Sequence, residues 1–234
     1  YPAHRWIRLG SYSFQSVELV KFSIIIAFSA FLADRMIKGE VSHKHKALKP
    51  IAIAFSIIVL VVAGLQSDLG STAVILAIMG SMWFIAGLPI RYIAIGLLVI
   101  GIVFALAIST SGYRRERMLT FMHPEKDCSS AGYQACQALI AIGSGGMFGK
   151  GIGHSVQAYG YLPEAANDSI FAILGEKFGF LGMSLLIAVF WGLFARIKNI
   201  MIRAPDNFSR LAVTGVLAWL STQTMINIGA MIGL

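Results

Sequence analysis

The sequence predicts an all-α membrane protein, a polytopic bundle of transmembrane helices joined by basic connectors and one long polar loop. Of its 234 residues, 57% are hydrophobic and only 13% are charged, and the mean hydropathy is +0.75. This composition is too apolar for a soluble globular domain. The apolar residues also gather in stretches near the length of about 20 residues that a helix needs to cross a hydrocarbon core.

Six apolar stretches are predicted to cross the membrane. They are Val17–Ile37, Ile51–Leu65, Leu69–Leu88, Tyr92–Ile108, Ile170–Ala195 and Leu211–Leu234. The second is short, so it is either tilted or crosses only in part. The polar and aromatic segment Tyr1–Phe14 is expected at headgroup level. We expect residues 1–234 to form a single integral membrane domain, cut from a longer protein because the first residue is not Met and the last falls in an apolar run.

Basic residues predict how the bundle is oriented. Lys and Arg gather in the connectors 35–50, 88–91 and 196–210, which six spans place on one side, and the positive-inside rule makes that side the cytoplasm. The loop 109–169 and the corner at Asp68 then face outward. The net charge of +8 could indicate nucleic acid. The basic residues sit in short connectors between apolar segments, however, so membrane orientation explains them better and no nucleic-acid partner is expected.

The loop 109–169 is too long to be featureless, and such loops tend to be functional. The segment Tyr133–Ile142 predicts a short amphipathic helix on the membrane surface, with Gln134 and Gln137 one turn apart. The glycines of 143–153 match neither a phosphate loop nor a dinucleotide-binding motif. Two interpretations of them stay open: tight turns that pack the loop, or backbone contacts with a lipid headgroup or sugar.

Both cysteines, Cys128 and Cys136, fall in this loop. A disulfide could form outside the cytoplasm, but a spacing of eight residues matches no known disulfide framework. Two free thiols are therefore the prediction.

Asp168 is the strongest candidate for a chemical role, and two interpretations of it stay open. It lies in Asn167-Asp168-Ser169, just before the span that starts at Ile170, where any of the three side chains could cap the helix. A half-desolvated carboxylate at the outer mouth of a bundle could instead act as a general base and take a proton from a sugar hydroxyl. Glu164, four residues earlier, is either a second ligand or acid or a solvated loop residue.

Other charged residues are candidates for the walls of a substrate cavity. Glu18 and Lys21 share one face of the first span, so they either form a structural ion pair or line the outward cavity that holds the candidate base. Asp68 lies at a similar depth, at a corner that water can reach. Arg114 and its neighbouring arginines could neutralise a pyrophosphate or anchor the chain at the interface. Lys150 completes this set, and no metal-ligand cluster is predicted.

The run from 132 to 182 closely resembles the signature of the SEDS family (shape, elongation, division and sporulation), and most resembles its cell-division branch. The matching segments in this run are Gly132-Tyr133-Gln134, Phe148-Gly149-Lys150-Gly151, Tyr161-Leu162-Pro163-Glu164-Ala165 with Asp168, Gly175-Glu176, and Gly179-Phe180-Leu181-Gly182. Upstream, Phe14-Gln15, Glu18-Leu19, Lys21 and Asp68-Leu69-Gly70 resemble two further family motifs. The similarity covers essentially the whole chain.

The resemblance implies a ten-helix enzyme of the bacterial cytoplasmic membrane, of which this chain holds about the middle six helices. Family members are peptidoglycan glycosyltransferases that polymerise lipid II beside a class B penicillin-binding transpeptidase and other division proteins, among membrane lipids. Asp168 matches the family's essential acid, and Glu18 and Lys21 match a second family motif. The implied reaction inverts the anomeric centre and requires no cofactor, and a divalent cation, Mg²⁺ or Mn²⁺, stays open as an aid to pyrophosphate departure.

Two other classes of function stay open as alternatives. A lipid II flippase would use buried charges such as Glu18, Lys21 and Asp68 for alternating access. A non-catalytic scaffold of the division machinery would tolerate loss of every acid. The chain also departs from the family pattern at Ala166-Asn167-Asp168-Ser169, where members usually have His-Thr-Asp-Phe, and it loses a proline at Ser16 and at Ser67. The acid is kept, so we expect the chemistry to be kept.

Overall fold

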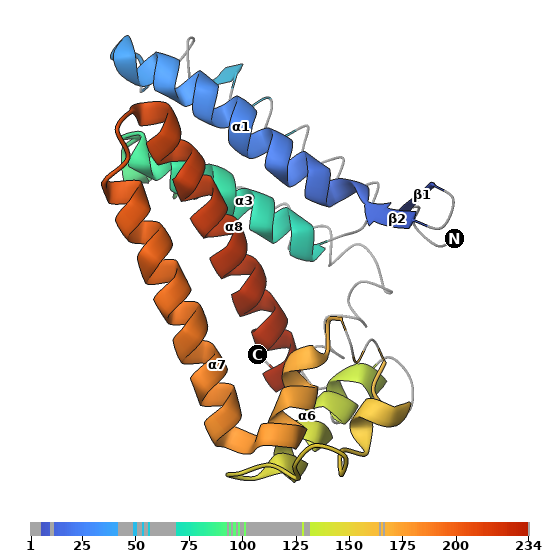
Figure 1. Ribbon diagram of the computed structural model, residues 1–234. Coiled ribbons are helices and arrows are strands. Elements are labelled where there is room, and N and C mark those ends of the chain that lie inside the picture. Colours follow the sequence, from blue (N-terminus) through green and yellow to red (C-terminus); the bar gives the residue numbers. More distant parts are fainter. Residues whose placement is uncertain are drawn as a thin grey trace. The chain divides into compact units, whose positions relative to one another are not determined.

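Figure 1 shows the computed structural model of the chain. The described residues are 6–9, 12–41, 49–50, 53, 56, 69–92, 94, 96, 98, 101, 128, 132–163, 165 and 167–233. Their regular secondary structure is helical apart from one hairpin, which confirms the all-α class. They fall into two compact units, Tyr1–Leu97 with Phe194–Gln223 and Leu98–Leu193 with Thr224–Leu234. That these units form one domain stays a prediction.

The first unit begins with a two-stranded hairpin, which the sequence did not predict. β1 (Trp6–Leu9) pairs antiparallel with β2 (Tyr12–Gln15), and Trp6 lies opposite Gln15. The residues pair because both short runs are rich in aromatic and branched side chains, which favour extended backbone. α1 (Ser16–Ile37) follows without a break and ends at the predicted residue.

Three helices form the core of the first unit. α3 (Leu69–Ile85) and the first part of α8 (Asn207–Ile232) pack with α1 around a buried apolar cluster. A Cβ added at Gly215 of α8 would lie 3.0 Å from the side chains of Ile25 and Met82, so α8 lies against both neighbours at close range. The largest fully buried apolar side chains of this core are Ile25, Leu32, Ile75, Ile78, Met82 and Leu211.

The second unit holds the described part of the long loop. α6 (Tyr133–Gly145) confirms the short helix predicted from Tyr133, and the 3₁₀ helix η4 (Gln157–Tyr159) follows a glycine-rich turn. α7 (Ile170–Ile202) then begins, and its axis breaks at Gly179. The core of this unit joins alanines of α6 to the first turns of α7, with Ala138, Ala141, Leu162, Phe171, Ala172 and Ile173 at its centre.

Three described helices, α1, α7 and α8, are long and apolar enough to cross a membrane, and α3 is a shorter apolar helix. α7 continues about two turns beyond the predicted end, so most of the predicted connector 196–210 is helical. The sequence missed this because Arg and Lys break the apolar pattern without breaking the helix. The predicted spans Ile51–Leu65 and Tyr92–Ile108 lie largely outside the described residues.

The prediction of two free thiols is wrong. Cys128 and Cys136 form a disulfide, with Cα atoms 5.5 Å apart, inside the range that disulfide geometry requires. Cys136 lies in the first turn of α6, and Cys128, eight residues earlier, lies beside it. The spacing of eight residues in the sequence does not predict that the two cysteines meet, because their distance depends on where α6 begins.

Candidate active site

Asp168 lies at the last turn before α7, and its carboxylate is exposed. Within the part of the chain that the structure describes, this carboxylate has no hydrogen-bond or ion-pair partner. It therefore caps none of the described N–H groups of α7. These contacts give no support to the interpretation of Asp168 as a helix cap.

The neighbouring Ser169 fixes the backbone that carries Asp168. Its hydroxyl is fully buried, donates to the Pro163 carbonyl at 2.9 Å and accepts from the Gln134 amide of α6 at 3.1 Å. The Ser169 carbonyl accepts from the N–H groups of Ala172 and Ile173, which starts α7. A solvent-facing acid is thus held on a turn that is tied to both α6 and α7.

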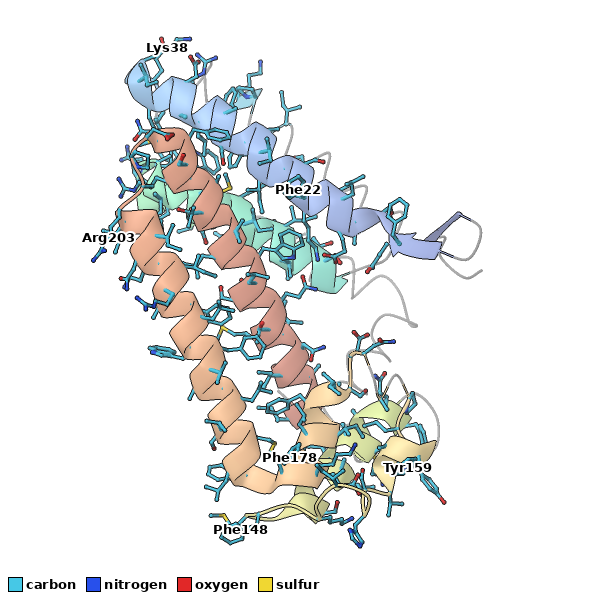
Figure 2. The ribbon with its side chains drawn as sticks, in the orientation of Figure 1. Phe22, Lys38, Phe148, Tyr159, Phe178 and Arg203 are labelled. Atoms are coloured by element: carbon cyan, nitrogen blue, oxygen red, sulfur yellow. A yellow bond between two sulfur atoms is a disulfide. The ribbon has the colours of Figure 1, made fainter. Side chains whose placement is uncertain are left out.

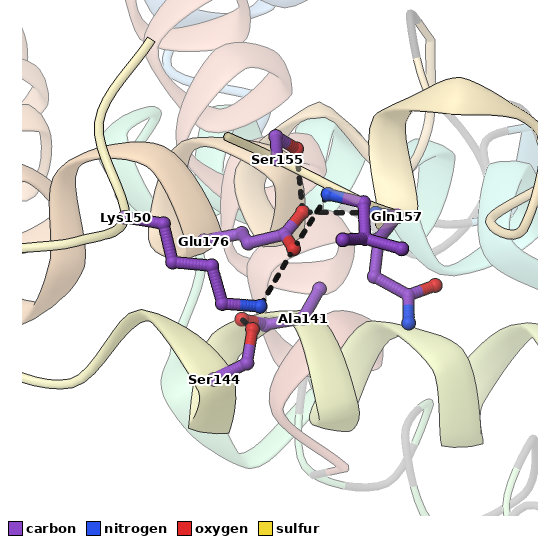
Figure 3. Close-up of polar contacts among 7 residues, drawn as sticks. Ala141, Ser144, Lys150, Ser155, Gln157 and Glu176 are labelled. Atoms are coloured by element: carbon purple, nitrogen blue, oxygen red, sulfur yellow. Dashed lines mark hydrogen bonds and ion pairs between the residues drawn. The ribbon is translucent and has the colours of Figure 1, made fainter. Parts of the chain in front are cut away.

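Among the described carboxylates of the second unit, Glu176 accepts the most hydrogen bonds (Figure 3). It is fully buried on α7, where the Ser155 hydroxyl donates to it at 2.5 Å and the backbone N–H groups of Val156 and Gln157 donate at 3.0 and 3.1 Å. The ammonium of Lys150 lies 3.2 Å away. These four donors all come from the chain segment before Asp168, so Glu176 anchors that segment to α7.

The glycine-rich turn exchanges backbone hydrogen bonds with the kink of α7. The break at Gly179 frees carbonyl groups one turn earlier and N–H groups just after it. Lys150 N–H and Gly151 N–H donate to the carbonyls of Glu176 and Lys177, at 2.9 and 3.0 Å. In return, the N–H groups of residues 180 and 181 donate to the carbonyls of residues 146 and 147, at 2.8 and 3.2 Å. These four groups of α7 are therefore paired with backbone groups of the turn, as buried backbone requires.

Gly149 and Gly179 leave no room for a side chain, because the backbones of the glycine-rich turn and of α7 touch at these positions. A Cβ at Gly149 would overlap the Lys177 carbonyl group, and a Cβ at Gly179 would overlap the backbone of Gly149 and lie 2.7 Å from the Met147 carbonyl. Gly149 and Gly179 also have positive φ. Of the two interpretations of the glycine stretch, these contacts favour packing of the loop.

The predicted pair of Glu18 and Lys21 is present in the first unit. The Lys21 ammonium lies 2.7 Å from the Glu18 carboxylate, donates to the side-chain oxygen of Gln223 at 3.1 Å and lies 5.7 Å from the ring centre of Trp219. Lys21 is buried although its partner is half-exposed. That this pair lines the same cavity as Asp168 stays a prediction.

Three candidate site residues, Asp68, Arg114 and Glu164, lie outside the described residues. Lys150, predicted to bind substrate, is within reach of Glu176 instead of standing alone. Glu176 itself was not singled out, although a lone acid inside an apolar run is a signal for a buried, paired group. Among the described residues, no three His, Cys, Asp or Glu side chains gather to hold a metal ion.

Three helices long and apolar enough to cross a membrane, one of them preceded by an exposed acid on a braced turn, define a class: an integral membrane protein with a polar turn at the end of a span. The family model of the FtsW, RodA and SpoVE proteins, described as "Cell cycle protein", matches residues 2–234. The chain belongs to this family, which confirms the resemblance to the SEDS proteins.

Curated relatives are similar in sequence to this chain along nearly its whole length. A probable peptidoglycan glycosyltransferase FtsW of Saccharophagus degradans is 39% identical over 99% of this chain and 60% of its own length. Stage V sporulation protein E of Bacillus subtilis is 34% identical over 98% of this chain and 62% of its own length. The chain therefore spans about three-fifths of the length of these relatives.

Two solved structures share the fold. One belongs to a peptidoglycan synthase complex described as coordinating polymerization and crosslinking; the TM-score is 0.80 at 26% identity, over 100% of this chain and 64% of that one. The other is the D255A mutant of the rod shape determining protein RodA of Thermus thermophilus, with a TM-score of 0.64 at 26% identity, over 100% and 59%.

Proposed function

We propose that the chain is the catalytic membrane region of a peptidoglycan glycosyltransferase that polymerises lipid II for septal cell-wall synthesis. One observation carries the proposal: the exposed carboxylate of Asp168 has no partner among the described residues, yet its turn is braced by the buried hydroxyl of Ser169. Family membership supports the reaction class, because curated relatives are named for it.

In this proposal Asp168 is the general base. Its carboxylate takes the proton of the GlcNAc 4-hydroxyl while the hydroxyl oxygen attacks the anomeric carbon of a lipid-linked MurNAc. A carbon–oxygen bond forms, and the bond from that carbon to the pyrophosphate oxygen breaks. Undecaprenyl pyrophosphate leaves with the electron pair, and attack from the opposite face inverts the anomeric centre. A base of this kind contributes about 10²–10⁴-fold to the rate.

The proposal places loop 109–169 outside the cytoplasm and the connectors 35–50 and 196–210 inside. The disulfide between Cys128 and Cys136 supports this orientation, since disulfides persist in oxidising compartments. A class B penicillin-binding transpeptidase is the proposed partner. Its support is the similar chain in a synthase complex that joins polymerization to crosslinking.

The test is Asp168→Asn in the full-length parent protein, assayed for lipid II polymerisation in liposomes. Asn caps helices about as well as Asp but cannot accept the proton. Because the Asp168 carboxylate has no described partner, we expect the free energy of unfolding to stay within about 0.5 kcal/mol of the parent value. Polymerisation should fall by about 10²–10⁴-fold.

Asp206→Asn is the matched control, because it neutralises another exposed acid that directly precedes a helix and should keep polymerisation. Normal glycan strands from stable Asp168→Asn would contradict the proposal. Labelled lipid II tests the flippase alternative, which the buried charge of Lys21 and its partner Glu18 favour. Translocation across the liposome membrane that disappears with Lys21→Met, without polymer in either protein, would support transport instead.

A further inference from the structure

The glycine-rich turn of the second unit presents apolar side chains outward. Phe148 is 80% exposed and Ile152 is 78% exposed, and Met147 beside them is also exposed. In Figure 2, Phe148 projects away from the body of its unit at the kink of α7, and Tyr159 of η4 projects from the other edge. Single exposed apolar residues are common on proteins, but three within six residues form an apolar patch, which indicates contact with a membrane or another protein.

α7 fixes the depth of this patch in the membrane. Residues 178–195 carry no charge, and Lys177 and Arg196 flank them. Beyond the kink at Gly179, the 16 positions 180–195 rise about 24 Å at 1.5 Å per residue, which is most of the hydrocarbon thickness of about 30 Å. The boundary on the side of loop 109–169 therefore falls at Lys177 and Phe178, next to the kink at Gly179.

The turn is held at the same depth by main-chain contacts. Four backbone hydrogen bonds join residues 146, 147, 150 and 151 to residues 176, 177, 180 and 181. Direct contact between Gly149 and the Lys177 carbonyl leaves no room for a side chain between them. Met147 and Phe148 consequently lie level with Phe180 and Leu181, which are themselves exposed on the apolar side of the kink.

We propose that Met147, Phe148 and Ile152 insert into the phospholipid leaflet on the side of loop 109–169, as a wedge at the boundary between headgroups and acyl chains. The occupant is lipid because the patch continues the exposed apolar surface of a membrane-spanning helix. Charge agrees with this choice. From Cys128 to Pro163 the sequence has no Asp or Glu, so this stretch carries no carboxylate that would repel anionic headgroups. The wedge would hold the turn that carries Asp168 at a fixed height above the acyl chains.

A spin-label measurement tests the wedge. Phe148→Cys and Ile152→Cys are made in the full-length protein, with any cysteine outside residues 1–234 replaced by serine. Cys128 and Cys136 are joined in a disulfide and leave the new thiol as the labelling site. Each labelled protein is reconstituted in vesicles of phosphatidylethanolamine and phosphatidylglycerol. Collision rates with oxygen, which concentrates in the acyl region, and with a water-soluble nickel complex then report depth.

Two matched variants calibrate the result. Leu185→Cys lies on the exposed face of α7 inside the uncharged window, and Tyr159→Cys is an exposed site of the same unit, at 71%. We expect the oxygen-to-nickel ratio to fall in the order Leu185, then Phe148 and Ile152, then Tyr159. Values at Phe148 and Ile152 equal to that at Tyr159, or to free label in buffer, would overturn the wedge. Protection of both sites from both probes would also overturn it, because a protein surface would then cover the patch.

Discussion

Two ion pairs of this protein have opposite arrangements. In the pair of Lys150 and Glu176, the carboxylate is fully buried and the lysine side chain is 35% exposed. In the pair of Lys21 and Glu18, the lysine is 2% exposed and the carboxylate 37% exposed. The first pair lies in the second unit and the other in the first.

The buried partners also differ in what else holds them. Glu176 accepts from a hydroxyl and two backbone N–H groups besides Lys150, so neutral donors carry most of its compensation. Lys21 has Gln223 and the ring of Trp219, and its only described counter-charge is Glu18. A buried charge is stable only where its partners replace water. Glu176 is therefore an anchor for a loop, and Lys21 depends on a charge that water or a ligand can reach.

Removing the buried acid should have the largest effect. Glu176→Ala leaves Ser155 and the N–H groups of residues 156 and 157 without an acceptor in a buried site, so we expect the free energy of unfolding to fall by about 3–5 kcal/mol. The loop should also detach from α7, which exposes the peptide bond after Lys150 to trypsin. Unfolding in mixed micelles and limited tryptic digestion measure the two effects.

Lys150→Met is the control for this substitution, because it removes only the exposed charge and should cost less than about 1 kcal/mol. Equal losses in both variants would show that the ion pair, and not the neutral donors, holds the loop. That outcome would make the two pairs alike.

Substituting Gly179 should detach the loop that binds Glu176 by disturbing the backbone contacts between the turn and α7. In Gly179→Ala the added Cβ meets the backbone of Met147 and Gly149, at a positive φ that alanine adopts with strain. We expect a loss of about 2–4 kcal/mol and faster cleavage after Lys150. Gly192→Ala is the matched control, because that glycine lies on the same helix with open space around it. The control should be neutral or slightly stabilising, and a similar loss there would refute the role given to the kink.

A direct comparison of the exposed partners sharpens the contrast between the pairs. Glu18→Gln leaves the buried Lys21 ammonium without its counter-charge, so the free energy of unfolding should fall by about 2 kcal/mol or more. Lys150→Gln leaves the Glu176 carboxylate with three neutral donors, so the loss should stay under about 1 kcal/mol. Thermal unfolding of both variants at one pH and salt concentration measures this difference. Adding Lys21→Met to Glu18→Gln should restore part of the loss, since no buried charge is then left. No recovery in the double variant would mean that Glu18 acts on stability by another route.

Apolar length and charge placement were enough to predict the four described apolar helices, α1, α3, α7 and α8, and their order. The starts of α1, α3 and α7 agree with the sequence to within one residue, because polar or capping residues precede each apolar run. Helix ends were harder to predict. Arg196 and Lys198 are good helix formers, so α7 continues where the apolar pattern stops. The hairpin and the disulfide also escaped prediction, since both depend on chain segments that meet in space.

The candidate site was predicted unevenly. Asp168 and the pair of Glu18 and Lys21 stand out because charges at or inside apolar runs are rare. Glu176 was missed as an anchor because its donors are mostly backbone groups, which no side-chain pattern reveals. The exchange of hydrogen bonds at Gly179 was missed for the same reason. A glycine in an apolar helix gives no sign that a loop will pair with it.

The smallest expected effect concerns Asp206, which directly precedes α8 in a stretch predicted as connector. The hydroxyl and then the N–H of Ser209 donate to its carboxylate, at 2.7 and 2.8 Å, and hold its pKa below the usual 3.8. A lowered pKa in the folded state means that the contribution to stability is present above pH 3.8 and is lost as pH falls through the folded value. Asp206→Ala should therefore lower the melting temperature slightly at neutral pH and match the parent protein in strong acid.

Asp206→Asn separates the two causes of this effect. Asn keeps the cap but not the charge, so it should retain most of the stability of the parent protein at neutral pH and show a flatter pH dependence. A loss as large as that of Asp206→Ala would show that charge near the N-terminus of α8, not hydrogen bonding to Ser209, provides the stability. This exposed cap would then resemble Glu18, which acts through charge, more closely than Glu176, which acts through hydrogen bonds.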